Sequence, residues 1–224
     1  MSLKRSESIL WNFHVSYNAD DDGSDPLFKL RPCYTYLKQK FLEAYSLSQN
    51  LSFDEAICPY KGRLRFKVYN PMKPTKFGIK IYEVTESDSG YLLGMNTGST
   101  AETTFHELVD LSDECSTTTK IVVGLLAFCG LLNKGHHVYL DNYYNSPELF
   151  EELTLLGTGA CGTIRANRKN MPTAKIKLDP GESVYRQKDN VLALKFHDKR
   201  DVNMLNYSLR YRCSFRSFPQ KHRG

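Results

Sequence analysis

Residues 117–165 read TTTKIVVGLLAFCGLLNKGHHVYLDNYYNSPELFEELTLLGTGACGTIR, and this stretch decides the fold class. Its first part is almost continuously apolar, which predicts a buried helix over 117–132 with Gly135 at the position of a C-terminal cap. Residues 137–140, HVYL, then form a short and mostly apolar strand that ends at Asp141. The first part of the stretch therefore predicts a helix followed closely by a buried strand.

The second part of the stretch repeats this order. Ser146, Pro147 and Glu148 supply a capping side chain, a proline and an acid, which is typical of a helix start. That helix is expected to stop at Gly157, and a further strand is predicted over 160–165. Because a strand that follows a crossover helix is usually parallel to its neighbour, both strands are expected to extend one sheet in parallel.

Upstream of this stretch the patterns indicate antiparallel strands. Loose alternation predicts a strand over 51–57, and the runs 78–85 and 90–96 are expected to form a hairpin around the polar turn 86–89. Three antiparallel strands followed by parallel additions is the order of the ribonuclease H-like fold, an α/β mixed sheet with flanking helices. The other predicted elements are helices over 3–16 and 30–46, an extended segment over 63–69, a hairpin of 183–185 with 191–196, and a last strand over 202–205.

The net charge of +5 in 224 residues is unevenly spread along the chain. Seven basic and no acidic residues fall between 61 and 80, and ten basic residues with four acids fall between 161 and 200. Residues 82–119, between these blocks, hold eight acids and no Lys or Arg. Two basic blocks favour a polyanionic partner such as nucleic acid, especially since Tyr69 and Phe77 interleave with the first block. The alternative is that these charges only solvate the surface, as most charge runs do.

Length and composition exclude several classes of protein. No apolar run reaches the ~20 residues of a membrane span, and the first residues do not resemble a secretory signal, so an intracellular chain without a membrane partner is expected. Six scattered cysteines without a paired C-x-x-C are expected to be small buried thiols rather than a disulfide framework or a zinc site. Neither a Walker-type glycine loop nor a Gly-x-Ser-x-Gly nucleophile motif is present.

Two acidic residues, one inside a predicted core strand and one at the carboxyl end of another, are candidate site residues. Asp54 lies inside the first strand, where a carboxylate is costly unless it is paired or binds a metal. Asp141 follows the strand after the first crossover, and sites in open α/β sheets cluster at such ends. If the two strands are neighbours, the carboxylates converge and suit Mg²⁺ or Mn²⁺ and phosphodiester chemistry. The alternative is a strand-edge Asp54 and an Asp141 that begins an Asx turn.

Several motifs resemble those of piggyBac transposases and the host proteins derived from them. FDE at 53–55 and YNPMKPTKFGIK at 69–80 are similar to the start of the family's catalytic core. Residues 135–150 resemble the family's second-aspartate motif, and ACGTIRANR at 160–168 is similar to the basic strand that follows it. The stretches DPLFKLRP at 25–32 and DKRDV at 198–202 also match, so the resemblance runs over roughly residues 1–205.

The resemblance implies a ribonuclease H-like core with three metal-binding aspartates. It implies a nuclear cut-and-paste DNA transposase that cleaves transposon ends and joins them to TTAA targets. Asp54 and Asp141 match the first two aspartates, both as catalytic residues and as ligands of Mg²⁺ or Mn²⁺. The positions that would line DNA are Lys61, Arg63, Lys73, Lys76, Lys80, Arg165, Arg168 and Lys169.

Departures from the family pattern change this expectation. The Gly-Gly-Val-Asp-like motif that carries the third aspartate is not found, and residues 206–224 diverge into a basic tail. We therefore expect a core that is incomplete at its C-terminal end and has lost catalytic activity. The expected parts are a helical segment over 1–50, the core over 51–205 with a basic hairpin region at 160–205, and the tail. A non-catalytic domesticated DNA-binding module and a decayed gene fragment are the alternatives, and a homodimer is left open.

Overall fold

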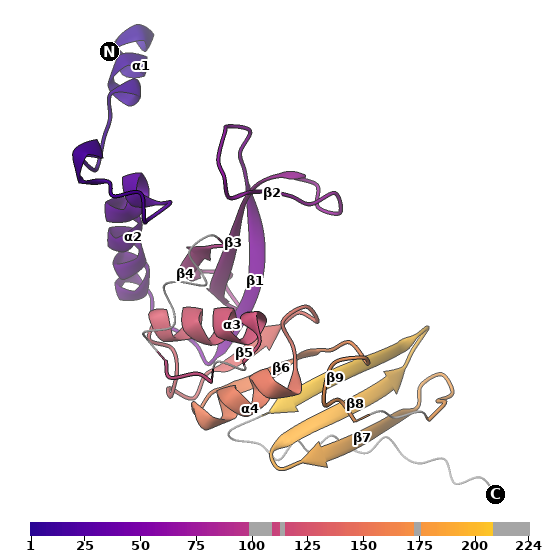
Figure 1. The fold of residues 1–224 in the computed structure, drawn as a ribbon. Helices are drawn as coiled ribbons and strands as arrows, with labels where there is room; N and C mark the ends of the chain where they lie inside the picture. Colours follow the sequence, from indigo (N-terminus) through magenta and orange to yellow (C-terminus); the bar gives the residue numbers. More distant parts are fainter. Residues whose placement is uncertain (99–108, 113–114, 173–175, 208–224) are drawn as a thin grey trace, which may run out of the picture.

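The computed structural model describes residues 1–98, 109–112, 115–172 and 176–207, and Figure 1 shows their arrangement. The helices are α1 (Leu3–Trp11), α2 (Arg31–Ala44), α3 (Thr117–Phe128) and α4 (Pro147–Leu155), with short 3-10 turns at Asn18–Asp20 and Phe28–Leu30. The strands are β1 (Asn50–Pro59), β2 (Lys67–Tyr69), β3 (Phe77–Glu86), β4 (Leu92–Thr97), β5 (His137–Leu140), β6 (Gly159–Thr163), β7 (Ser183–Lys188), β8 (Val191–His197) and β9 (Asp201–Tyr207). The predicted tail lies outside the described residues from position 208 onward.

The nine strands of the described residues belong to one mixed sheet. Its order is β2-β3-β1-β5-β6-β9-β8-β7, and β4 pairs with β3 as a branch. The first strand is antiparallel to β3 and parallel to β5, and β5 is parallel to β6. The remaining strands, β9, β8 and β7, continue the sheet in antiparallel pairs. The predicted order, antiparallel strands followed by parallel additions, is therefore confirmed, and so is the mixed α/β class.

The core lies on the face of the sheet that α3 and α4 cover. On β1 the side chains of Leu51 and Phe53 are buried, whereas Ser52 between them is only half-buried and Asp54 is exposed. Because side chains alternate between the faces of a strand, Leu51 and Phe53 point to the core and Asp54 points to the opposite face. The helices α3 and α4 contact each other and contribute fully buried leucines and phenylalanine to the same cluster.

The helix α3 ends earlier than the apolar run indicated. It stops at Phe128, and Gly130 adopts a left-handed backbone with φ 66°. The N–H of Gly130 then donates to the carbonyl of Ala127, and the N–H of Leu131 donates to that of Leu126. This pattern is a Schellman motif, which closes a helix at a glycine. The prediction of a helix to 132 with Gly135 as its cap was therefore wrong, because the first glycine ended it.

Three other expectations needed correction. The helix expected over 3–16 ends at Trp11, because the backbone of Asn12 leaves the helical conformation with φ −104° and ψ 7°. Only Lys67–Tyr69 of the extended segment at 63–69 is a strand, because a turn bonds the Lys67 N–H to the Leu64 carbonyl. The buried-thiol prediction was wrong for Cys33 and Cys58, which are exposed free cysteines.

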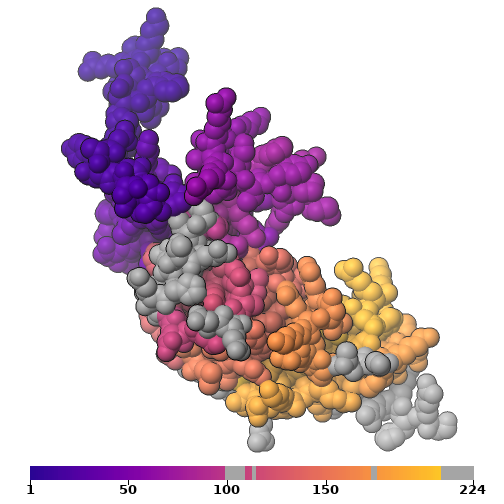
Figure 2. All heavy atoms as spheres, in the orientation of Figure 1, coloured from indigo at the N-terminus to yellow at the C-terminus, as the bar shows by residue number. Residues whose placement is uncertain are grey.

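Two segments project from the body of the molecule. The N-terminal part with α1 and α2 and the far half of β1 and β3 form separate projections, as Figure 2 shows. None of the residues in α1 is buried. The second projection carries β2 and the loops on either side of it (Figure 1). Within the described residues, no helix combines the length and apolar character that a membrane crossing needs.

Candidate functional site

Asp54 and Asp141 occupy equivalent places on adjacent parallel strands. The register of β1 and β5 pairs Phe53 with Leu140, and the two aspartates are the next residues along their strands. Both aspartates are exposed. Because the paired strands run in the same direction, the register brings the two carboxylates to one edge of the parallel part of the sheet. That is the arrangement that sequence reasoning expected if the first and fourth core strands were neighbours.

Negative charge accumulates around Asp54. Partial burial of its carboxyl raises the pKa of Asp54, and the neighbouring charge of Glu55 raises it further. Glu83 lies directly opposite on β3, and burial followed by the charge of Asp54 raises the pKa of Glu83. Carboxylates crowded in this way suit a divalent cation, since oxygen is the ligand that Mg²⁺ and Mn²⁺ prefer. Sequence reasoning did not single out Glu83. The alternation of side chains along the predicted strand 78–85 could have shown which face of the sheet Glu83 occupies.

The donor set therefore fits a metal in part. Asp54 and Asp141 supply two hard oxygen ligands, and the N–H of Glu55 donates to Asp54 Oδ1 at 2.8 Å, which orients that carboxylate. The described residues contain no group of three His, Cys, Asp or Glu side chains placed to hold a metal ion. The resemblance to the family assigns the third ligand to an aspartate for which no matching motif was found in the sequence.

The loop that follows Asp141 is fixed by hydrogen bonds to several elements. The backbone N–H groups of Tyr144 and Asn145 donate to the Asp141 carbonyl. The fully buried Asn145 side-chain amide donates to the Leu140 carbonyl at 3.1 Å and to the Thr163 carbonyl at 2.7 Å, so it ties the loop to β5 and β6. Such a bonded loop holds Asp141 in a defined position without help from a ligand.

Arg168 has a contact within the protein that sequence reasoning did not anticipate. Its guanidinium donates to the carbonyl oxygens of Asn142 and Tyr143, at 3.3 Å to the first. The sequence placed Arg168 among the DNA-lining residues, and the structure places it against the backbone of the Asp141 loop. This contact was not visible in the sequence, because a basic residue within a basic run does not indicate that it bonds a backbone carbonyl.

A buried tyrosine joins the two aspartate strands. The Tyr144 hydroxyl donates to Glu55 Oε2 at 2.6 Å, and its ring meets the Phe53 ring edge-on with centroids 4.9 Å apart. Burial raises the pKa of Tyr144, and Glu55 raises it further. Although burial opposes it, the hydrogen bond from Tyr144 and the charges of Lys80 and Lys73 hold the pKa of Glu55 below its usual value. Glu55 is therefore a hydrogen-bond partner of the Asp141 loop. Its two-residue spacing from Phe53 indicates this position, because residues two apart on a strand share one face.

The projecting strands form a basic ribbon, which we define as residues 59–80. Its exposed cations include Lys61, Arg63 and Lys76. Tyr69 and Phe77 are 58% and 53% exposed, and their ring centroids lie only 4.6 Å apart. Aromatic faces beside free cations are the combination that binds nucleic-acid bases and phosphates together.

Two cations of the basic ribbon also contact the aspartate site. Lys73 Nζ lies 3.5 Å from Glu55 Oε1. Lys80 Nζ lies 4.8 Å from the Tyr82 ring centroid and 5.2 Å from that of Tyr143, in the Asp141 loop. These contacts place the base of the ribbon against Glu55, the residue after Asp54, and against the Asp141 loop.

The second basic block faces a pocket beyond the Asp141 loop. Arg165 and Lys169 are exposed after β6, and Arg165 lines the pocket together with Asn142, the residue after Asp141. The structure therefore describes all eight residues that the sequence assigned to DNA. Lys73 pairs with Glu55, and Arg168 bonds backbone carbonyls. The other six cations are exposed or half-buried and show neither kind of contact within the described residues.

The ion pairs of Asp201 give a pH prediction. Its carboxylate binds Lys195 Nζ at 2.8 Å and His197 Nδ1 at 2.5 Å, and these bonds lower the pKa of Asp201 below its ordinary value of 3.8. A lowered pKa in the folded chain stabilises the fold above pH 3.8, and this contribution is lost as pH falls through the folded pKa. We expect the gap in unfolding midpoint between the wild type and Asp201→Asn to narrow below pH 3.8. Thermal denaturation from pH 6 to pH 2 measures it, and a constant gap would contradict the assignment.

The sheet order, the two aspartates that directly follow the paired stretch of the parallel strands β1 and β5, and the basic ribbon define the class of ribonuclease H-like DDE transposases. Comparison with known proteins agrees, since the family model described as "Transposase IS4" matches residues 1–222. The chain belongs to the piggyBac transposase family within this class.

Two human relatives support this assignment, and one solved structure shares the fold. The chain is 30% identical over 171 residues to human "PiggyBac transposable element-derived protein 3", covering 74% of this chain and 27% of that protein. It is 28% identical over 208 residues to human "PiggyBac transposable element-derived protein 2", covering 89% and 34%. The structure titled "Cryo-EM structure of piggyBac transposase synaptic complex with hairpin DNA (SNHP)" matches with a TM-score of 0.80 and 19% identity, over 92% of this chain and 43% of that one. The chain spans about a third or less of these curated relatives.

Proposed function

We propose that this chain is a DNA-binding member of the piggyBac family that holds the first two metal ligands of a phosphodiester-cleaving site. The observation that carries the proposal is the contact between the basic ribbon and the aspartate site, through Lys73 to Glu55 and Lys80 to Tyr143. The similar solved structure is, by its title, a synaptic complex with hairpin DNA, which supports DNA as the partner. A DNA partner makes the nucleus the compartment that we propose.

The binding surface is assigned to exposed cations rather than to base-reading groups. Lys61, Arg63 and Lys76 stand on the basic ribbon without an acidic partner among the described residues. Cations of this kind neutralise phosphates and release counterions, which gives affinity without sequence information. The ribbon therefore binds any duplex, and recognition of particular transposon ends falls to other parts of the surface.

Salt dependence tests the assignment of the ribbon. We expect the affinity for a duplex of 30 base pairs to fall steeply between 50 and 200 mM salt, and the triple change Lys61→Ala, Arg63→Ala and Lys76→Ala to reduce the slope of log K against log salt by about 2–3. Fluorescence anisotropy with a labelled duplex measures both slopes.

A matched triple variant controls for the loss of net charge. Lys134, Lys177 and Arg186 are exposed and lie outside the ribbon, so changing all three to alanine removes the same charge at other places. This control is expected to keep the wild-type slope to within about 1. A flat salt response of the wild type, or an equal loss of slope in both triple variants, would contradict the proposal that the ribbon binds DNA.

A divalent metal, where bound, would be held by Asp54 and Asp141. The chemistry that it would supply there is activation of a water molecule and stabilisation of the leaving oxygen of a phosphodiester. The protein's own contribution is position: the Asp141 loop is fixed by Asn145 and Arg168, and Asp54 Oδ1 is oriented by the Glu55 N–H. With two of the three ligands identified, weak metal binding and a steep loss of electrostatic stabilisation are expected.

Cleavage itself is tested by nicking. We expect the 224-residue chain to show no Mn²⁺-dependent nicking of a duplex carrying TTAA-flanked ends, because two carboxylates hold a metal ion poorly. Asp54→Ala and Asp141→Ala are the controls, and an agarose gel of a supercoiled plasmid carrying the ends gives the readout. Robust nicking that both substitutions abolish would show that the site is catalytically complete.

A further inference from the structure

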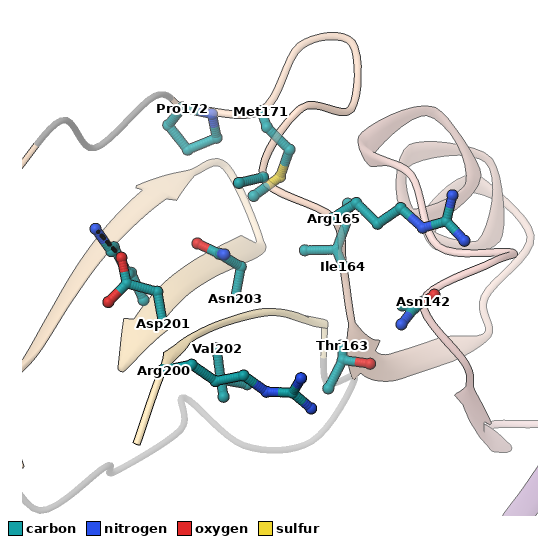
Figure 3. A pocket seen from close by; sticks show the side chains of 12 residues that line it. Asn142, Thr163, Ile164, Arg165, Met171, Pro172, Arg200, Asp201, Val202 and Asn203 are labelled. Atoms are coloured by element: carbon teal, nitrogen blue, oxygen red, sulfur yellow. Dashed lines mark ion pairs between the residues drawn. The ribbon is translucent and has the colours of Figure 1, made fainter. Parts of the chain in front are cut away.

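The strands β7, β8 and β9 carry their charged side chains on one face only. The register places Arg186, Lys195 and Asp201 on the same face of the three strands. Leu205 of β9 also lies on that face and is buried in the core. Farther along the same face a pocket opens, and Figure 3 shows it with the ion pair of Lys195 and Asp201 as a dashed line. The charges of these strands therefore all lie on the side of the core and the pocket.

The opposite face of the same three strands is apolar. Tyr185, Leu194 and Met204 stand opposite one another in a single cross-strand row. Leu192 and Phe196 flank this row on β8, because side chains two apart on a strand share a face. Tyr185 is 64% exposed, Phe196 is 37% exposed, and the other three are half-buried. We call these five residues the apolar face; the structure describes the three strands in full, and no Lys, Arg, Asp or Glu of theirs lies on it.

This pattern is the reverse of that of an ordinary surface sheet. An antiparallel sheet that packs one face on the core usually turns polar side chains to water on the other face. Here the face away from the core carries large apolar side chains instead, and such contiguous patches mark interaction sites. The uncharged surface continues across β6 and β5, where Thr163 stands opposite Met204 and Tyr139 is 44% exposed. The apolar face therefore has the character of a docking surface.

Charge selects a second copy of this chain as the occupant. In a two-fold contact each surface meets itself, so any charge on it faces a like charge of the partner, which is destabilising. The apolar face carries no such charge, although the chain as a whole carries +5. Nucleic acid is a poor occupant, because its phosphates need cations that this face does not offer.

The size of the face sets the strength of the contact. Five strands, β7 to β5, at about 4.8 Å spacing and about six residues at 3.3 Å give an outline of about 24 by 20 Å. This outline is smaller than the roughly 800 Å² that each partner gives to a standard interface, so a weak contact is expected. We propose that two copies of this chain associate through the apolar face, sheet against sheet, in a reversible dimer. The dimer does not depend on DNA binding.

Methionine oxidation tests the proposal on the unmodified full chain. Hydrogen peroxide oxidises accessible thioethers, and mass spectrometry of a digest gives a rate for each methionine. Between 1 and 100 µM protein in about 300 mM salt, which screens charge contacts, the rate at Met204 is expected to fall about threefold or more by mass action. Met72 is 89% exposed on the basic ribbon, so its rate is the internal control and stays unchanged. Analytical ultracentrifugation over the same range is expected to show the mass rising from one chain toward two.

Opposite charges on the apolar face separate a face-to-face dimer from any other contact. Leu194→Lys/Met204→Lys and Leu194→Glu/Met204→Glu are each expected to stay monomeric at 100 µM, because the contact then brings like charges together. An equimolar mixture of the two is expected to regain the dimer, since only a surface that meets itself pairs Lys with Glu. Leu37→Lys/Leu155→Lys is the matched control: both leucines are exposed, on α2 and α4, and this variant is expected to dimerise like the wild type.

Several outcomes would overturn the proposal. A wild type that stays monomeric at 100 µM does so, and if Met204 is then protected at both concentrations, residues 208–224 of the same chain become the occupant. A dimer that survives either charge change, or a mixture that stays monomeric while both variants unfold at the wild-type temperature, also contradicts it. If the charged variants do not fold, oxidation and sedimentation of the wild type decide the question without them.

Discussion

Replacing Tyr144 with alanine is expected to lower the free energy of unfolding by about 3–5 kcal/mol, the range for removing a large aromatic side chain from a core. The Tyr144 side chain is fully buried. Its ring meets those of Phe53 and Tyr82 edge-on, with centroid distances of 4.9 and 6.3 Å. Alanine would leave a cavity at the junction of β1, β3 and the Asp141 loop, which the surrounding strands cannot close. Urea unfolding followed by circular dichroism measures the loss.

Tyr144→Phe separates the hydrogen bond from the ring. The phenylalanine fills the same space but leaves the half-buried Glu55 carboxylate without the donor that lies 2.6 Å from its Oε2. We expect a loss of about 1–3 kcal/mol, the cost of an unsatisfied buried acceptor. Tyr139→Ala is the control, because Tyr139 on β5 is 44% exposed and points to the other face. If Tyr144→Ala costs no more than Tyr139→Ala, the loop is not anchored through this ring.

The position of the aspartate pair was predictable because it depends on local patterns. Phe53 lies within an alternating run and Leu140 ends a mostly apolar run, and each is followed by an acid. Periodicity gives the two strands, and the rule for crossover helices makes them parallel. The sequence left open whether the two strands are neighbours and in which register, and the structure makes them adjacent with Phe53 opposite Leu140.

Contacts that join distant segments were beyond the reach of pattern arguments. Tyr144 and Glu55 are separated by 89 residues, and Arg168 reaches carbonyls about 25 residues before it. Sequence periodicity reports which face a residue occupies but not which backbone atom its side chain will meet. For the same reason the pocket beside the Asp141 loop was not predicted, since β9 inserts between β6 and β8 and this order brings Arg165 and Arg200 to the lining of one pocket.

The end of α3 shows that a glycine which closes a helix can override an apolar run in the sequence. The apolar run continues past Gly130 to Leu132, so periodicity extends α3 through the glycine. In the structure the backbone of Gly130 adopts a positive φ and two carbonyls of the last turn are satisfied by the residues after it. A glycine that closes a helix in this way outweighs a favourable apolar run, because it satisfies backbone groups that would otherwise be left without partners.

Close packing of β6 against β5 leaves no room for a side chain at Gly162. The register pairs Gly162 with Leu140, the residue immediately before Asp141. A Cβ at Gly162 would lie 2.1 Å from the Leu140 carbonyl oxygen and 2.2 Å from Asn145 Nδ2. Both atoms belong to the network that fixes the Asp141 loop, because Asn145 donates to that same carbonyl. The glycine therefore maintains the close approach on which the position of Asp141 depends.

Gly162→Ala is accordingly expected to lower the free energy of unfolding by about 1–3 kcal/mol or more through overpacking, and to displace the Asp141 loop with it. Gly159→Ala on the same strand is the matched control: its added Cβ would lie 2.8 Å from the His137 ring, and an imidazole turns aside more readily than a strand carbonyl moves. Urea unfolding gives the two costs. Amide hydrogen exchange at Tyr144 and Asn145, whose N–H groups bond the Asp141 carbonyl, reports the loop and is expected to speed up only in Gly162→Ala. A smaller cost for Gly162→Ala than for Gly159→Ala, with exchange unchanged, would show that the strand separation adapts and that Asp141 is positioned by other contacts.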